Sequence, residues 1–167
     1  MNLETLRTLY QYDRWANGQV WACVEKLSEE QFTQESDYSI GSVHNQVFHL
    51  MVSELWAMKL FGEAIDDEMK ALKQEDFPTR AAIRSQWDRH IQRLDSALDA
   101  LTDEKLQAPV DVTLASDLKG ALWEFLMAMI NHAMDHRSQI LALIHKLGGE
   151  TCEHEFWFYM LDRQKSD

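Results

Sequence analysis

The sequence predicts an all-α protein, a four-helix bundle with long connections between its helices. Apolar residues recur at spacings of three and four over several long segments, which is the period of an amphipathic helix. The 167 residues include only six glycines and two prolines, so long helices can continue without interruption. With 46% apolar residues, the chain suits a single domain, residues 1–167, that buries one sizeable core.

The first two helices are predicted from their apolar pattern and their flanking residues. The first runs from about Leu3 to Leu27, where an approximate apolar stripe faces inward. After a turn and a polar loop, either Ser39 or Ser42 can cap the second helix, because a serine hydroxyl accepts a hydrogen bond from a free N–H of the first turn. The second helix ends at about Phe61, since Gly62 follows it.

The middle of the chain contains a connection, the third helix and a short apolar run. Residues 63–76 are acidic and are expected to form a loop or a frayed helix. Pro78 precedes the third helix, about Arg80–Leu101, which has apolar residues at spacings of three and four and a charged opposite face. After a polar turn, residues 110–114 (VDVTL) can be extended because β-branched residues favour strands.

The fourth helix is predicted to be the longest. Ser116 is its expected cap, and it runs from about Asp117 to Leu147. Gly148 and Gly149 follow and are expected to end it. A last aromatic segment, residues 155–161 (EFWFYML), is expected to pack across the bundle as a short helix or an irregular tail.

Charge and composition exclude several classes of protein. The net charge is −12, and the sequence has no stripe of Lys and Arg that could hold a phosphate backbone, so we expect no nucleic-acid partner. The amino-terminal residues do not resemble a signal peptide, and the longest apolar runs have six residues, so we expect a soluble, cytoplasmic protein without a membrane span. Cys23 and Cys152 have no CxxC spacing and are interpreted as ordinary buried thiols.

Two histidines in the fourth helix, His132 and His136, are the strongest candidates for a binding site. Residues four apart are displaced by only about 40° around a helix axis, so both imidazoles can bind one metal ion if a neighbouring helix adds a third ligand. The alternative is a hydrogen-bonded or surface pair. The same face carries Phe125, Met129 and Ile140 and is directed to the core, where buried imidazoles need partners. His145 lies on a different face.

The second helix offers two candidates for the third ligand, His44 and His49. They are five residues apart, so about 140° separates them around the axis and at most one of them can join the other two histidines. His49 lies deeper within the helix, whereas His44 is in the first turn, where a polar side chain can reach solvent or a loop. The pattern favours His49 and leaves His44 open.

Three segments resemble the DinB/YfiT superfamily of four-helix-bundle metalloproteins: YDRWANGQV, SIGSVHNQVFHLMVSELW and MINHAMDHRSQIL. The resemblance spans nearly the whole chain, and it implies that the metal ligands are His49, His132 and His136. Three histidines leave one coordination position open for water or substrate, as in catalytic sites. Zinc or nickel suits neutral imidazole ligands, and iron also fits. Ser138 stands where many relatives have glycine, which leaves the ligands in place.

The resemblance also implies a metal-dependent enzyme. Some relatives are thiol S-transferases that use bacillithiol or mycothiol, so the expected partner is a small-molecule substrate, with a low-molecular-weight thiol as the candidate. Metal-assisted hydrolysis is the second enzymatic interpretation. Asp135 and Glu54 are candidates for a group behind the ligands or a general base, although both have plain structural interpretations. Arg137 and Gln139 are interpreted as orienting and surface residues.

The competing hypothesis is a non-catalytic, metal-stabilised stress or binding protein that acts as a homodimer. Beyond its histidine face, the fourth helix carries Leu126, Ile130 and Leu141. This is more apolar surface than one neighbouring helix can cover, so the sequence predicts a homodimer through this helix.

Overall fold

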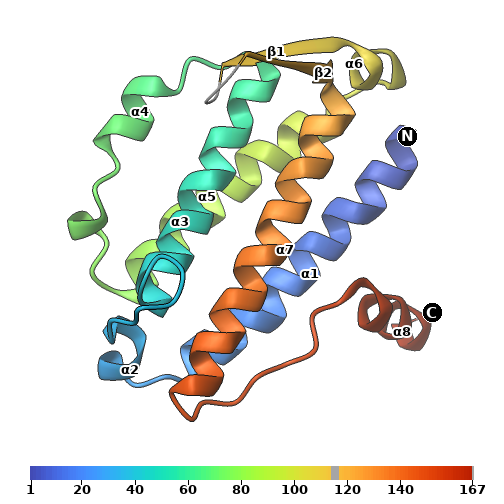
Figure 1. Ribbon diagram of the computed structural model, residues 1–167. Coiled ribbons are helices and arrows are strands. Elements are labelled where there is room, and N and C mark those ends of the chain that lie inside the picture. Colours follow the sequence, from blue (N-terminus) through green and yellow to red (C-terminus); the bar gives the residue numbers. More distant parts are fainter. Residues whose placement is uncertain (114–116, 167) are drawn as a thin grey trace.

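Four long helices form the bundle in the computed structural model, which describes residues 1–113 and 117–166. They are α1 (Leu3–Glu25), α3 (Val43–Trp56), α5 (Arg80–Asp99) and α7 (Leu122–Lys146), and they run side by side in Figure 1. Helix α7 packs between α1 and α3, and α3 also contacts α5. The prediction of an all-α four-helix bundle with long connections is confirmed.

Shorter elements make up the connections between the long helices. They are α2 (Glu29–Thr33), the 3₁₀ helices η1 (Ala57–Phe61) and η2 (Gln74–Asp76), α4 (Asp66–Ala71), α6 (Asp103–Gln107), the strands β1 (Pro109–Thr113) and β2 (Asp117–Ala121), and α8 (Phe156–Ser166). The acidic segment 63–76 thus contains two short helical pieces. Acidic side chains in the first turn of α4 suit the positive end of a helix dipole.

Capping residues explain where the second predicted helix begins and ends. The Ser42 hydroxyl accepts a hydrogen bond from the N–H of Asn45, so Ser42 rather than Ser39 caps α3. The chain continues from α3 into η1 as far as Phe61. Gly62 then adopts a φ of +81°, a left-handed conformation that ends the helix. The predicted end at Phe61 is correct, and the last turn is of the tighter 3₁₀ type.

The predicted start of the fourth helix at Asp117 is wrong. Residues Asp117–Ala121 form strand β2, which pairs antiparallel with β1 so that Val110 lies opposite Gly120. Of the residues expected to be extended, 110–113 find their partner here and Leu114 lies outside the described residues; ladder hydrogen bonds replace those of a first helical turn. Helix α7 begins at Leu122, where the Glu124 carboxylate accepts a 2.7 Å hydrogen bond from the N–H of Ala121. The proposed cap, Ser116, lies outside the described residues.

The buried apolar side chains form two main clusters, one toward each end of the bundle. One contains Leu6, Leu55 and Leu126, and the other contains Val24, Val47 and Ile144. Along α1 and α7, buried polar residues occupy the stretch between the two clusters, and Gln46 of α3 is buried against His136; the set is Asp13, Asn17, Gln46, His136 and Arg137. We call these five residues the polar layer.

The residues that favoured a dimer are buried within the single chain. Leu126 is fully buried, Ile130 is 4% exposed and Leu141 is 9% exposed, because neighbouring helices of the same bundle cover them. More than one helix of the same chain contacts α7, so its apolar surface does not require a second copy of the protein. The dimer itself stays a prediction that no longer draws support from these residues.

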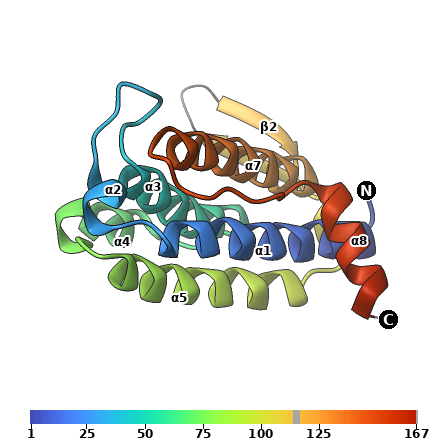
Figure 2. The same cartoon turned by 90° about the horizontal axis from the view of Figure 1, so that it is seen from below.

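Helix α8 lies across α1, as Figures 1 and 2 show. Tyr12 and Trp15 of α1 pack against Phe156 and Tyr159, with ring centroids 5.2 to 5.9 Å apart for the pairs that join the two helices. This confirms the prediction that the aromatic segment packs across the bundle, and of the two expected forms, a short helix or an irregular tail, it adopts the helix. None of the helices in the described part of the chain is long and apolar enough to cross a membrane.

Candidate metal centre

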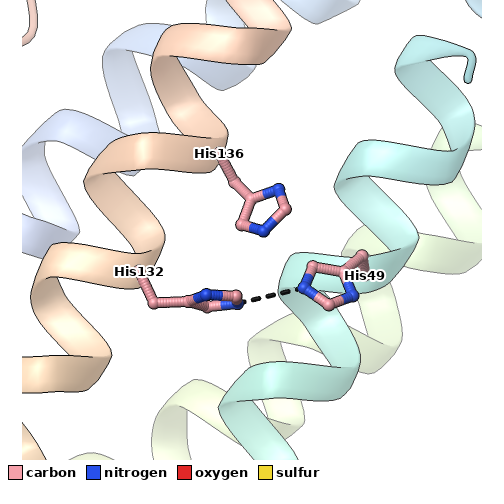
Figure 3. Close-up of side chains that lie close together, drawn as sticks. All are labelled: His49, His132 and His136. Carbon is pink, nitrogen blue, oxygen red and sulfur yellow. Dashed lines mark hydrogen bonds between the residues drawn. The ribbon is translucent and has the colours of Figure 1, made fainter. Parts of the chain in front are cut away.

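Three histidines come together between α3 and α7 in the middle of the bundle. His49 projects from α3, and His132 and His136 project from α7, one turn apart (Figure 3). Their ring centroids are 4.4 to 5.1 Å apart, and one nitrogen of each ring lies within 4.8 Å of the others. The structure thus brings together the three residues expected to be metal ligands.

His44 does not join this cluster. Its Nε2 donates a 2.7 Å hydrogen bond to the carbonyl of Phe77, and its Nδ1 lies 3.0 Å from the amide nitrogen of Gln74. Both ring nitrogens therefore bind the connection that precedes α5. The choice between His44 and His49, which spacing left open, falls on His49.

The protonation of the three rings suits metal binding. Burial lowers the pKa of His49 and of His132, and it lowers the pKa of His136 to about 4, to which the neighbouring rings of His49 and His132 add. All three are therefore neutral at neutral pH, and a neutral imidazole has the lone pair that a metal ion requires.

The distances within the cluster also fit a metal ion. The Nε2 atoms of His49 and His132 are 3.0 Å apart, so two lone pairs face each other unless a proton or a cation lies between them. Two nitrogens that bind zinc at a tetrahedral angle are roughly 3.3 Å apart, since each Zn–N bond is about 2.0–2.1 Å. The three imidazoles could therefore hold a divalent ion once the rings turn to bring their nitrogens, which lie within 4.8 Å of one another, to this spacing.

Behind His136, a side chain that the sequence analysis missed fixes the ring. The Nδ1 atom of His136 is 2.7 Å from the side-chain oxygen of Gln46, which is completely buried in α3. The Gln46 amide in turn donates to Gln139 over 3.1 Å. One signal was available in the sequence, because Gln46 is three residues before His49 and shares its helix face.

Arg137, interpreted from the sequence as an orienting or surface residue, is completely buried. It donates hydrogen bonds to the carboxylate of Asp13 and, over 2.9 Å, to the side-chain oxygen of Asn17. Its guanidinium carbon also lies 5.8 Å from the centre of the Tyr12 ring. The surface interpretation is wrong because a buried carboxylate on α1 supplies the partner that a buried cation needs. Three residues of the YDRWAN segment, Tyr12, Asp13 and Asn17, thus contact Arg137.

The two candidates for a general base, Asp135 and Glu54, are bound to other side chains. Asp135 is exposed and accepts a 2.8 Å hydrogen bond from Gln139. Glu54 forms a 2.6 Å ion pair with Arg14, and burial raises the pKa of its carboxyl. Glu54 and His132 line one small internal cavity of about 20 Å³, which has room for a single water molecule.

On the solvent side, a surface pocket adjoins the cluster. It has a volume of about 280 Å³, and its lining combines apolar side chains, Ile40, Phe48 and Val52, with the amides of Asn45 and Gln74. His49 also lines it, so a small molecule in this pocket would lie against one of the three candidate ligands.

The two cysteines pack in the apolar cluster that contains Val24, Val47 and Ile144. Cys23 is buried on α1 and Cys152 is half-buried against the same apolar cluster. Burial, together with a hydrogen bond to Cys23, raises the pKa of the Cys152 thiol to about 12. Cys152 is therefore a protonated packing residue at neutral pH, in agreement with its interpretation as an ordinary thiol.

Comparisons with known proteins agree with this fold. The family model of the DinB family matches residues 1–165. Protein DinB of Bacillus subtilis (strain 168) is 25% identical over 157 residues, which cover 91% of each chain. The crystal structure of a DinB-like protein from Bacillus cereus ATCC 10987 has a TM-score of 0.64 at 17% identity, covers 91% of this chain and 97% of its own, and supports the fold. The chain therefore belongs to the DinB family.

Proposed function

We propose that this protein is a cytoplasmic, metal-dependent enzyme that acts on a small molecule, either as a thiol S-transferase or as a hydrolase. The observation that carries the proposal is the convergence of three neutral imidazoles, from His49, His132 and His136, on one point beside a surface pocket. Three protein ligands leave one position of a four-coordinate ion for an exchangeable molecule, which is the arrangement of catalytic rather than structural sites.

Zinc or nickel is the proposed ion, because neutral imidazoles suit both. When bound, such an ion supplies a Lewis acid that activates a thiol or a water molecule for attack on an electrophile. The low pKa of His136 keeps this ligand neutral, and Gln46 holds its ring in place. The apolar side chains and amides of the adjoining pocket would bind and orient the substrate beside His49.

The site has features that suit thiol transfer and features that suit hydrolysis. The resemblance to the DinB/YfiT superfamily implies thiol transfer, and the pocket beside His49 offers amide groups that can bind the peptide-like portion of a low-molecular-weight thiol. The same site suits hydrolysis of a small ester, since the ion would activate water in the same way.

The first experiment measures the metal. We expect elemental analysis of the purified protein to find about one equivalent of zinc or nickel, and His132→Ala to lose it. His44→Ala is the matched control, because His44 lies on the same helix as His49 but binds Phe77 and Gln74 instead. Equal metal content in all three proteins would contradict the proposed site.

The second experiment measures turnover. The metal-loaded protein is incubated with low-molecular-weight thiols and an alkylating electrophile, or with small esters, and loss of free thiol or release of acid is followed. Turnover that disappears in His49→Ala and persists in His44→Ala supports the enzyme. A metal-loaded protein without turnover on either panel supports the alternative, a non-catalytic binding protein.

One observation favours that alternative. Helix α8 exposes Trp157 (65% exposed), Met160 and Leu161 at the spacing of one helix face. An uncovered apolar face of this kind suits the homodimer expected of a binding protein. Sedimentation at micromolar concentration tests it: a monomer that persists at all concentrations contradicts the dimer.

A further inference from the structure

We propose that Asp135, Gln139 and Gln46 form a directional chain of hydrogen bonds that holds His136 in one tautomer, with its proton on Nδ1 and its Nε2 lone pair facing the other two histidines. These are positioning residues, and the inference rests on the proposed metal site. It deepens that proposal by naming the groups that prepare one ligand before any ion arrives.

The contacts run without a break from the surface to the ligand. The Asp135 carboxylate is 2.8 Å from the Gln139 amide nitrogen, and the Gln139 oxygen is 3.1 Å from the Gln46 amide nitrogen. The Gln46 oxygen is then 2.7 Å from Nδ1 of His136. The chain starts on α7, crosses to α3 and returns to α7, so it links the two helices that carry the three histidines.

The first group in the chain sets its direction. A carboxylate only accepts hydrogen bonds, so Gln139 must turn its NH₂ group to Asp135 and its oxygen to Gln46. The Ser39 hydroxyl also contacts the Gln139 oxygen and is compatible with this orientation, because a hydroxyl can donate to an amide oxygen. Gln46 must then donate to Gln139 and present its own oxygen to His136, whose Nδ1 is left as the donor.

The opposite arrangement would be costly. If both amides were reversed, the Gln139 oxygen would face the Asp135 carboxylate, and the Gln46 NH₂ group would face Nδ1 of His136. The ring proton would then move to Nε2, where it would block metal binding. Gln46 is completely buried, so no water can replace the hydrogen-bond partners that its amide would lose while it turned around.

The first test reads the tautomer directly in the metal-free protein. Long-range ¹H–¹⁵N correlation spectra distinguish a protonated Nδ1 from a protonated Nε2 for each histidine ring. We expect His136 to carry its proton on Nδ1 in the unaltered protein, and to become a mixture of tautomers in Gln46→Leu. A wild-type His136 protonated on Nε2 overturns the proposal. Because no metal is present, this result does not depend on the proposed function.

The second test measures affinity for zinc by competition with a chromophoric chelator. Loss of a partner behind a metal-binding histidine weakens binding by roughly 10- to 100-fold, which we expect for Gln46→Leu. Gln92→Leu is the matched control on α5, away from the cluster, and should leave the Kd unchanged. An unchanged Kd in Gln46→Leu contradicts the role of Gln46, whereas absence of zinc binding in every protein contradicts the metal site alone.

The third test addresses the direction of the chain. Gln46→Glu keeps an acceptor for His136 but places a second carboxylate against the Gln139 oxygen, and Asp135→Asn allows Gln139 to turn around. Asp135→Asn alone should weaken zinc binding slightly, because it removes a nearby negative charge. In the Gln46→Glu protein the same change should instead strengthen zinc binding, by roughly threefold or more. A weakening in both backgrounds contradicts a directional chain.

Folding is checked by circular dichroism and thermal melting for every variant. If Gln46→Leu fails to fold, Gln139→Leu serves in its place, since Gln139 is only half-buried and its loss also frees the Gln46 amide. An unchanged His136 tautomer and an unchanged zinc affinity in Gln139→Leu would then contradict the chain.

Discussion

Arg137 and its partners show how a buried charge is stabilised in this bundle. Its guanidinium is completely buried and binds Asp13, which is 3% exposed, and Asn17. A buried ion pair adds little stability compared with apolar residues of the same shape, but removal of one partner leaves the other charge unpaired in a medium of low polarity. Arg137 therefore acts as a structural tie between α7 and α1.

We predict that Arg137→Leu lowers the free energy of unfolding by about 3 kcal/mol, the low end for a broken buried ion pair, because the buried Asp13 keeps only a 3.4 Å contact with Arg14 and a hydrogen bond from Asn17. Urea denaturation measures the change. Asp13→Asn added to Arg137→Leu should recover part of the loss, since the amide carries no charge. A loss smaller than about 1 kcal/mol in Arg137→Leu would mean that water reaches Asp13 and that the pair is not a tie.

The pKa of His136 predicts how the metal-free protein responds to acid. It is about 4 in the folded chain, against about 6.5 for an unperturbed histidine. Between these two pH values the unfolded chain binds more protons than the folded one, so the free energy of unfolding falls as the pH drops from 6.5 to 4. The loss from this one ring is at most about 3 kcal/mol, and it stops below the folded pKa.

Urea denaturation in the presence of a chelator, at pH 7 and pH 5, measures this dependence. His136→Phe is the comparison, because the other titrating groups then contribute equally to both proteins. We expect the variant to lose less stability between the two pH values. Equal losses in the two proteins would show that His136 titrates normally.

At the scale of the element, two glycines in different backbone conformations, Gly148 and Gly18, give a matched pair of substitutions. Gly148 follows α7 with a φ of +75°, where any other residue is strained, whereas Gly18 lies exposed inside α1. A Cβ atom added at either position meets nothing within 4 Å, so only backbone effects distinguish them.

We expect Gly148→Ala to destabilise the protein by about 1 kcal/mol and Gly18→Ala to stabilise it by about 0.5–1 kcal/mol. Thermal and urea denaturation measure both changes. The same sign in both variants would contradict the left-handed end of α7.

Sequence patterns predicted most elements because their causes are local. The cap at Ser42, the end at Gly62 and the apolar period of α5 depend on residues within a few positions of each other. The start of α7 was wrong because pairing with β1 decides the conformation of Asp117–Ala121, and a pairing partner is not visible in a local pattern.

The residues of the candidate site likewise fall into those that local spacing predicts and those that depend on distant partners. Spacing placed His132 and His136 on one face, because four residues along a helix are always neighbours. Burial of Arg137 escaped prediction, since its carboxylate partner, Asp13, lies on another helix at a separation of 124 residues. Gln46 was missed because glutamine has no chemistry of its own that marks it as a partner of a metal ligand.

At the scale of the whole molecule, a metal ion would join parts of the chain that are far apart. His49 and His132 are 83 residues apart in sequence and lie on facing helices. An ion that binds only the folded chain stabilises it by about 2.7 kcal/mol at a free concentration of one hundred times the Kd.

We therefore predict that zinc or nickel raises the melting temperature by roughly 5–10 °C at that concentration, as measured by differential scanning fluorimetry or calorimetry. His132→Ala should show no increase, and His44→Ala should respond as the unaltered protein does. An increase that persists in His132→Ala would place the ion elsewhere in the chain.

Most of the polar layer lies between two apolar clusters, so the candidate metal centre and the apolar packing occupy different parts of the bundle. The two apolar clusters, around Leu126 and around Ile144, contain side chains of α1, α3 and α7, so apolar packing joins these helices on both sides of the histidines. Replacement of a ligand such as His49 by another coordinating side chain should consequently change the chemistry while the scaffold persists. The bundle is in this sense a ready frame for redesign of its reactive centre.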